Sequence, residues 1–275
     1  MKDFDIYFGP RFGKRQYLRD LWNFRGLLYF LAWRDILVRY KQTVIGIAWS
    51  LLNPLFFMVV FTAIFSRIGR FPSDGQTPYP LLVFSALLPW QLFASALTQS
   101  SKSLVENARM VSKIYFPRLL IPLSSVVVSL VDFLISLGLL LAMMIYYQWN
   151  PGWRLLALPL FLGLGLLTAL SLGIWLAAIN VKYRDFQYII PFLMQIGLFV
   201  SPVGFSSSVI PPEWRLLYAL NPMVGVIDGF RWCLLGGQVP LYLPGLGLSL
   251  LLTLLLLRGG IAYFHKTERT FADYI

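Results

Sequence analysis

The sequence predicts an all-α polytopic membrane protein with six transmembrane helices. Six stretches contain no Asp, Glu, Lys or Arg: Thr43–Ser66, Gly75–Ser101, Phe133–Trp153, Leu155–Val181, Phe186–Pro212 and Trp232–Leu257. Each is long enough to span a bilayer, because about 20 residues rising about 1.5 Å each cover the roughly 30 Å hydrocarbon core. The composition is also too apolar for a soluble domain, with 58% hydrophobic and 13% charged residues, whereas soluble proteins contain about 25% charged residues.

The distribution of basic residues supports the same fold class and predicts its orientation. Of the 23 Lys and Arg residues, 18 fall in the two terminal segments and in every second connection. The positive-inside rule therefore predicts that both termini are cytoplasmic, which agrees with an even number of spans. The net charge of +11 then describes mainly a cytoplasmic surface facing anionic lipid and partner proteins, and nucleic-acid binding is the weaker interpretation.

The sequence predicts a single domain over residues 1–275, with a cytoplasmic amphipathic region at 1–42, six spans within 43–264 and a cytoplasmic tail at 265–275. The first forty residues are polar and basic and lack the apolar core of a signal peptide. The single cysteine, Cys233, excludes an internal disulfide, and there is no Cys/His cluster for a metal ion.

An amphipathic helix in the cytoplasmic interface is predicted for the N-terminal region. Its apolar residues recur at intervals of three and four: Tyr17, Leu21, Phe24, Leu28 and Leu31. A basic cluster of Arg34, Arg39 and Lys41 follows it. The first span is predicted over Val44–Phe65, with a kink at Asn53-Pro54 because proline removes a backbone hydrogen bond.

The second and third spans are predicted over Pro80–Leu97 and Phe116–Tyr147, joined by a short cytoplasmic helix over Thr98–Lys113. Asp132 lies about 15 Å past Pro122, close to the bilayer midplane. An ionisable group at this depth should face protein or water. Two interpretations remain open: a carboxyl group bonded to a neighbouring helix, or a direct role in transport. The sequence offers no Lys or Arg at a similar depth as its partner.

The fourth, fifth and sixth spans are predicted over Leu155–Ile179, Ile189–Ser206 and Leu241–Phe264. Val181–Tyr188 forms a second short cytoplasmic connection. Charged and amide residues between the last two spans exclude a lipid-facing helix, while the many apolar residues there argue against an exposed loop. We expect two short re-entrant helices in the outer leaflet, buried in protein, the second with Asn221 as N-cap and Pro222 as first residue.

Catalytic and nucleotide-binding motifs are absent from this sequence. It contains no G-x-x-x-x-G-K-[ST] phosphate loop, no nucleophile elbow and no paired catalytic carboxylates. The chain is therefore predicted not to be an enzyme, and any ATP-driven process needs a second polypeptide. Thr98–Lys113 and Val181–Tyr188 are candidate docking segments for it, although both could be ordinary loops. Their candidate contact residues are Lys102, Glu106, Asn107, Arg109, Arg184 and Asp185.

Aromatic residues are abundant, with 22 Phe, 14 Tyr and 9 Trp. Many lie near predicted interfaces, where aromatic belts are common. Five recur within the first and fifth spans: Phe56, Phe57, Phe61, Phe192 and Phe199. Core or lipid packing explains them by default. The alternative is an aromatic-lined conduit, in which flat apolar rings offer stacking surfaces to sugars.

Four segments in order resemble a known family. They are the runs Trp33–Gly46 (WRDILVRYKQTVIG), Tyr115–Ser124 (YFPRLLIPLS) and Asn180–Asp185 (NVKYRD), and Asn221-Pro222-Met223 with Gly229–Trp232 (GFRW). Together they span about Trp33–Trp232. The pattern is similar to ABC-2-type polysaccharide export permeases, nearest to the Wzm-type O-antigen permeases. Capsule and teichoic-acid exporters share much of it.

The resemblance implies a half-transporter of the bacterial inner membrane. Two copies would pair, each would dock one ATP-binding cassette subunit, and the complex would move a lipid-linked polysaccharide from cytoplasm to periplasm. ATP and Mg²⁺ would bind the partner, so this chain would need no cofactor. Thr98–Lys113 and Val181–Tyr188 would be its coupling helices. Arg34, Arg39 and Lys41 would meet the lipid diphosphate at the cytoplasmic mouth, and spans one and five would line the conduit.

Two other functions stay open at this point. The chain could be an ABC-2 exporter of a small drug or lipid. It could also be a membrane enzyme acting on polyprenyl lipids, but such an enzyme needs several acidic or histidine residues at one membrane face. Asp132 is the only acidic residue within the predicted spans, so the enzyme is the more distant alternative.

Overall fold

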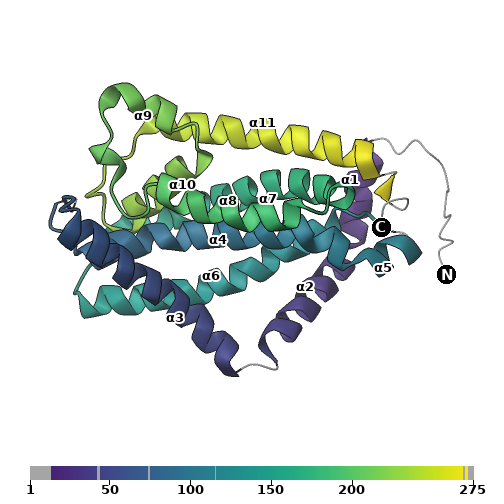
Figure 1. The fold of residues 1–275 in the computed structure, drawn as a ribbon, viewed down its shortest axis with the longest axis horizontal. Coiled ribbons are helices and arrows are strands. Elements are labelled where there is room, and N and C mark those ends of the chain that lie inside the picture. Colours follow the sequence, from purple (N-terminus) through teal and green to yellow (C-terminus); the bar gives the residue numbers. More distant parts are fainter. Residues whose placement is uncertain (1–13, 42–43, 74, 115, 269, 272–275) are drawn as a thin grey trace.

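The computed structural model describes residues 14–41, 44–73, 75–114, 116–268 and 270–271, and every regular element among them is a helix. Four long helices run side by side (Figure 1): α4 (Tyr79–Glu106), α6 (Leu120–Tyr146), α7 (Leu158–Lys182) and α11 (Leu243–Glu268). Helix α4 is the centre of the bundle, because it packs against both α6 and α7, and α11 covers the far side of α7. In the most apolar window of α4, 78% of residues are buried, against 17–33% in the other spans.

Five helices are long and apolar enough to cross a membrane: the four above and the continuous helix Ser50–Ile68, which joins most of α3 (Val44–Phe61) to the π-helix η1 (Thr62–Ile68). The protein is therefore a polytopic membrane protein. The predicted fifth span is the shorter helix α8 (Phe186–Val200). It ends before Ser206 because Pro202 disfavours helical backbone at the residue before it, and Ser201 is accordingly extended.

The N-terminal amphipathic segment forms two helices, α1 (Lys14–Asn23) and α2 (Arg25–Tyr40), with a break at Phe24. The side chain of Tyr17 lies outside the described side chains. Helix α2 packs against α6 through buried Leu31 and leaves Trp33 half exposed. It runs obliquely from the end of the bundle near α5 and forms a V with α3 (Figure 1).

The sequence predicted one separate helix over Thr98–Lys113, and this prediction is wrong. Residues up to Glu106 continue α4, and only α5 (Ala108–Lys113) is distinct. Helix α4 continues through this polar segment because its side chains form hydrogen bonds within the bundle. Ser101 and Ser103 donate to carbonyls three residues earlier, and Asn180 of α7 donates to the Ser101 carbonyl at 3.0 Å. These serines therefore lie inside the helix bundle.

The region before α11 contains the two short helices predicted, α9 (Pro212–Tyr218) and α10 (Pro222–Leu234). The Asn221 side chain caps α10 by accepting a hydrogen bond from the Met223 amide at 3.1 Å. Helix α10 is buried against α4, α7 and α11, whereas α9 exposes apolar side chains such as Trp214. The 3₁₀ helices η2 (Gly152–Ala157) and η3 (Ser207–Val209) complete the fold.

The C-terminal segment packs back onto the start of α6. Glu268 accepts a hydrogen bond from the Arg118 amide through its side chain and another from the Arg118 guanidinium through its carbonyl. Phe271 is fully buried against Phe264 and lies under the Arg118 guanidinium. The part of the predicted tail that the structure describes is thus attached to the bundle.

Candidate functional site: a polar cavity within the bundle

A cavity of about 630 Å³ lies between α3, α4, α6 and α8. One wall is apolar and aromatic, including Phe57 and Trp90. The polar residues lining it are Arg39, Ser50, Asn53, Gln91, Ser95, Ser129, Asp132, Ser136 and Gln195. Such a concentration of amide and hydroxyl groups is unusual in apolar helices, because polar groups facing lipid lose their hydrogen bonds. The cavity can therefore hold water or a polar, hydroxyl-bearing ligand.

Part of this polar wall is prearranged by hydrogen bonds between α4 and α6. Gln99 donates to Ser95 at 2.6 Å and to Ser129 at 3.2 Å, and the two serine hydroxyls lie 3.3 Å apart. Ser129 also donates to the Ser125 carbonyl. The Ser95 and Ser129 hydroxyls thus line the cavity with their hydrogen bonds already formed within the protein.

Asp132 has a cationic partner that the predicted spans did not offer. Arg39, on α2, forms an ion pair with its carboxylate at 2.8 Å, and the Tyr40 hydroxyl donates to the other carboxylate oxygen. Helix α2 supplies both groups, since it packs obliquely on α6 and ends halfway along it (Figure 1). The prediction failed here because the partner belongs to a helix that was expected to lie in the interface plane.

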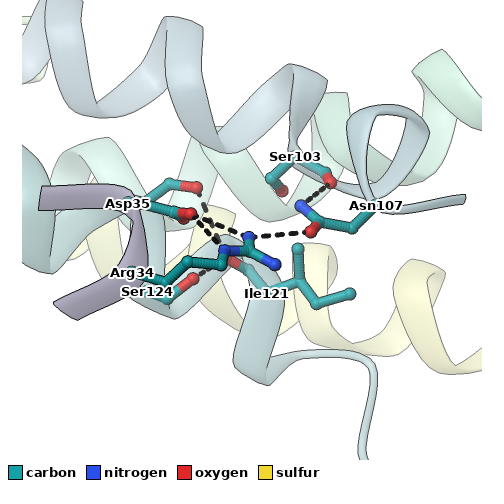
Figure 2. A network of polar contacts seen from close by, with 7 residues as sticks. Arg34, Asp35, Ser103, Asn107, Ile121 and Ser124 are labelled. Carbon is teal, nitrogen blue, oxygen red and sulfur yellow. Dashed lines mark hydrogen bonds and ion pairs between the residues drawn. The ribbon is translucent and has the colours of Figure 1, made fainter. Parts of the chain in front are cut away.

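Arg34 lies one and a half turns earlier on α2 and reaches a different site. Its guanidinium lies between the Asp35 carboxylate, at 2.7 Å, and the Asn107 side-chain oxygen, at 2.9 Å (Figure 2). Asn107 in turn donates to the Ser103 carbonyl. Lys41 is exposed at the end of α2. The three predicted basic residues therefore point to three different environments rather than to one cluster.

The predicted docking residues lie at neighbouring helix ends, because α4 and α7 are joined there by the Asn180–Ser101 hydrogen bond. Glu106 and Arg109 are exposed at the α4–α5 junction, and Lys102 is half-buried one turn earlier. Arg184 and Asp185 are exposed in the turn between α7 and α8. Asn107 differs from the others because it is bonded to Arg34.

Three of the five predicted conduit aromatics, Phe57, Phe61 and Phe199, come together. Phe61 is buried and stacks on Phe199 with ring centroids 5.6 Å apart. Phe57 lies beside Phe61 and lines the cavity. Phe56 and Phe192 are instead 70% and 61% exposed. The sequence analysis missed three residues that extend this cluster beyond α3 and α8: Phe65, Phe71 and Phe205.

Arg231, another residue that was not predicted as functional, holds the irregular segment that follows α8. Its fully buried guanidinium donates to the carbonyls of Leu82, Phe205 and Val203 at 3.3, 2.8 and 3.0 Å. Tyr79 donates to a further carbonyl there, that of Gly204, at 2.7 Å. An arginine inside an otherwise apolar run was the available signal, since such a group is stable only with several acceptors.

The Tyr218 hydroxyl anchors the end of α8 from α9, donating to the Val200 carbonyl at 2.8 Å. Burial, together with the nearby Asp228 carboxylate, raises the pKa of Tyr218 above its usual value. The phenol therefore remains protonated and keeps its role as a donor at physiological pH.

Among the described residues, no group of three His, Cys, Asp or Glu residues could hold a metal ion.

Comparison with known proteins places this architecture in a family. Residues 26–235 match the family model described as ABC-2 type transporter. The chain is 31% identical over 261 residues to a Myxococcus xanthus protein named O-antigen export system permease protein RfbA, covering 94% of this chain and 98% of that protein. Two Klebsiella pneumoniae proteins of the same name are 29% and 27% identical to it, and each alignment covers 90% of this chain and 95% of the relative. The chain belongs to the ABC-2 type transporter family.

Proposed function

We propose that this chain is the permease subunit of an O-antigen export system and that it moves a lipid-linked polysaccharide out of the bacterial cytoplasm. The observation that carries the proposal is the similarity of this chain to three proteins named O-antigen export system permease, along almost the whole of each chain. The cavity supports it, because hydroxyl and amide groups beside aromatic rings are suited to sugars.

The proposed topology has six crossings of the inner membrane, with both termini in the cytoplasm. Helix α8 is about 22 Å long at 1.5 Å per residue, so the segment after it must complete the fifth crossing. Arg231 supports this assignment, because its hydrogen bonds allow irregular backbone to lie at membrane depth. Helices α9 and α10 would then re-enter the outer leaflet.

ATP hydrolysis in the proposed complex belongs to separate ATP-binding subunits, as in other ABC transporters. Two copies of this chain would each dock one such subunit. The proposed contacts lie near the ends of α4 and α7: the exposed residues Glu106, Arg109, Arg184 and Asp185, with the half-buried Lys102 beside them. Asn107 would act with them through its hydrogen bond to Arg34.

The proposed conduit lies between the two copies. Phe56 on α3 and Phe192 on α8 are exposed, which fits a face completed by a second chain. Phe57, Phe61 and Phe199 would form the aromatic part of its wall. Arg34 would lie on the cytoplasmic side, where the diphosphate of the lipid carrier enters, and Arg39 and Lys41 would lie deeper, at the end of α2 that reaches Asp132 in the middle of α6.

Deleting the gene in its own bacterium tests this function. We expect lipid-linked polysaccharide to accumulate on the cytoplasmic side and surface O-antigen to disappear, with both effects reversed by the wild-type gene. Normal surface polysaccharide in the deletion strain, together with a new sensitivity to a small toxic compound, would contradict the proposal and favour a drug exporter.

A further inference from the structure

Arg39 and Asp132 are the ionisable residues among the described lining of the cavity, and they are bonded to each other. The Arg39 guanidinium meets one carboxylate oxygen at 2.8 Å, while the Tyr40 hydroxyl donates to the other. A guanidinium and a hydroxyl around two oxygens of one anion are also the donors that bind a phosphate group well. The carboxylate therefore occupies a site built for an oxyanion.

The exposure of the two partners differs in a way that favours exchange. The Asp132 side chain is 18% exposed and is fixed on α6, whereas the Arg39 side chain is 41% exposed. A ligand in the cavity can therefore reach the guanidinium without first removing Asp132. A phosphate offers more negative charge and more acceptor oxygens than one carboxylate, so it can compete for the same donors.

We propose that Arg39 and Tyr40 bind the diphosphate of the lipid-linked substrate and that Asp132 is an internal competitor, which holds this anion site until the diphosphate displaces it. The inference rests on the proposed function, which supplies the diphosphate.

Exchange of the anion has a consequence for Arg34, which lies five residues before Arg39 on α2. While Asp132 holds Arg39 and Tyr40, α2 is fixed to the middle of α6, and Arg34 of the same helix is fixed to Asn107 at the α4–α5 junction. If the bonds to Asp132 break, the Arg34–Asn107 hydrogen bond remains as a second attachment of α2, and α2 can shift relative to the α4–α5 junction. The occupied anion site is thereby connected to the segment proposed to contact the ATP-binding subunit.

Binding of radiolabelled undecaprenyl diphosphate to the permease–ATPase complex in zwitterionic nanodiscs tests the inference. Asp132→Asn keeps the size and an acceptor for Tyr40 but removes the competing charge. If Asp132 occupies the site about 90% of the time, this variant binds the lipid about tenfold more tightly than wild type. Arg39→Lys, which keeps the charge but loses the planar guanidinium, binds it more weakly. Glu213→Gln, an exposed charge removed on α9, leaves the affinity unchanged.

Unchanged or weaker binding by Asp132→Asn overturns the inference, provided that variant purifies as an intact complex. If it does not, the pair exchange Arg39→Asp with Asp132→Arg decides instead: it restores assembly but places the arginine on α6, and we expect weakened lipid binding. Unaltered binding there also overturns the inference. Inorganic diphosphate and phosphatidylglycerol, added as competitors, separate the sources of the anion. Excess inorganic diphosphate should weaken lipid binding, because it offers the same anion to Arg39 and Tyr40, and a lack of competition at saturating concentration would contradict the assignment. Displacement by phosphatidylglycerol at matched concentration would contradict it as well.

These results are separable from failure of the proposed function. A wild-type gene that restores surface O-antigen, combined with an Asp132→Asn protein of unchanged lipid affinity, rejects only the competition. A wild-type complex that neither binds the lipid nor restores export rejects both.

Discussion

At the scale of single residues, the most constrained group is Arg231. It is fully buried, and its guanidinium donates to the Leu82 carbonyl of α4 and to two carbonyls, those of Val203 and Phe205, in the segment without regular helix after α8. Each such bond involves a charged donor and is worth about 1.5–3 kcal/mol, and unpaired buried carbonyls are costly. The irregular path of the chain after α8 therefore depends strongly on this one side chain.

Replacing Arg231 with methionine preserves much of its volume but removes all its donors. We expect the free energy of unfolding to fall by about 3 kcal/mol or more, because the buried carbonyls of Val203 and Phe205 lose this donor, while the Leu82 carbonyl still accepts from the Ser85 hydroxyl. Thermal unfolding of the purified protein in detergent measures the loss. Arg215→Met is the matched control, since that guanidinium binds the carbonyls of Ile210 and Ser208 nearer the surface, and it should cost less than about 1 kcal/mol. Equal losses would contradict the assignment.

Contacts between residues close in the sequence could be predicted, whereas contacts between residues far apart in the sequence could not. Asn221 was placed correctly as an N-cap because the cap bonds an amide two residues away. The partner of Asp132 could not be predicted, because Arg39 lies 93 positions earlier and only the packing of α2 on α6 brings them together. Arg231 shows the same limit, since its acceptors belong to α4 and to the segment after α8.

At the scale of elements, apolar length predicted which segments are helices but not where every helix ends. Helix α4 continues past the predicted boundary because its serines bond its own carbonyls and Asn180 joins it to α7. Helix α8 stops early at the Ser201-Pro202 step. Close packing then depends on small residues, which allow helix backbones to approach.

Gly229 is such a residue between α10 and α7. A Cβ placed there would lie 2.0 Å from the ring of Phe161, which is buried and cannot move aside. Gly229→Ala should therefore destabilise the protein by about 1–3 kcal/mol through overpacking. Gly163→Ala is the control on α7: a Cβ there meets nothing within 4 Å, and alanine is the better helix former. We expect its melting temperature to be unchanged or higher, and a comparable loss in both variants would show that the close contact is not the cause.

At the scale of the whole molecule, the exposed faces of α3 and α8 and the exposed ends of α4 and α7 have different roles in the proposed complex. The faces of α3 and α8 are apolar, with Phe56, Phe192 and Leu193 exposed, and suit contact with a second copy and the conduit. The ends of α4 and α7 are charged, with Glu106, Arg109 and Asp185 exposed nearby, and suit an ATP-binding partner. The sequence predicted charged connections and apolar spans, because most of the charged residues lie outside the spans.

Uncoupling of ATP hydrolysis from export tests the charged surface. Replacing Glu106 and Arg109 with alanine removes two exposed side chains at the α4–α5 junction without touching the Arg34–Asn107 bond. We expect the complex to insert and hydrolyse ATP while surface polysaccharide falls at least about tenfold, which corresponds to roughly 1.4 kcal/mol of lost coupling. The matched control replaces Arg67 and Glu213, exposed charges outside the proposed docking surface, and should export normally. Wild-type export by the Glu106 and Arg109 variant would mean that this junction does not transmit the work of ATP hydrolysis, and the turn at Arg184 and Asp185 would then have to carry it alone.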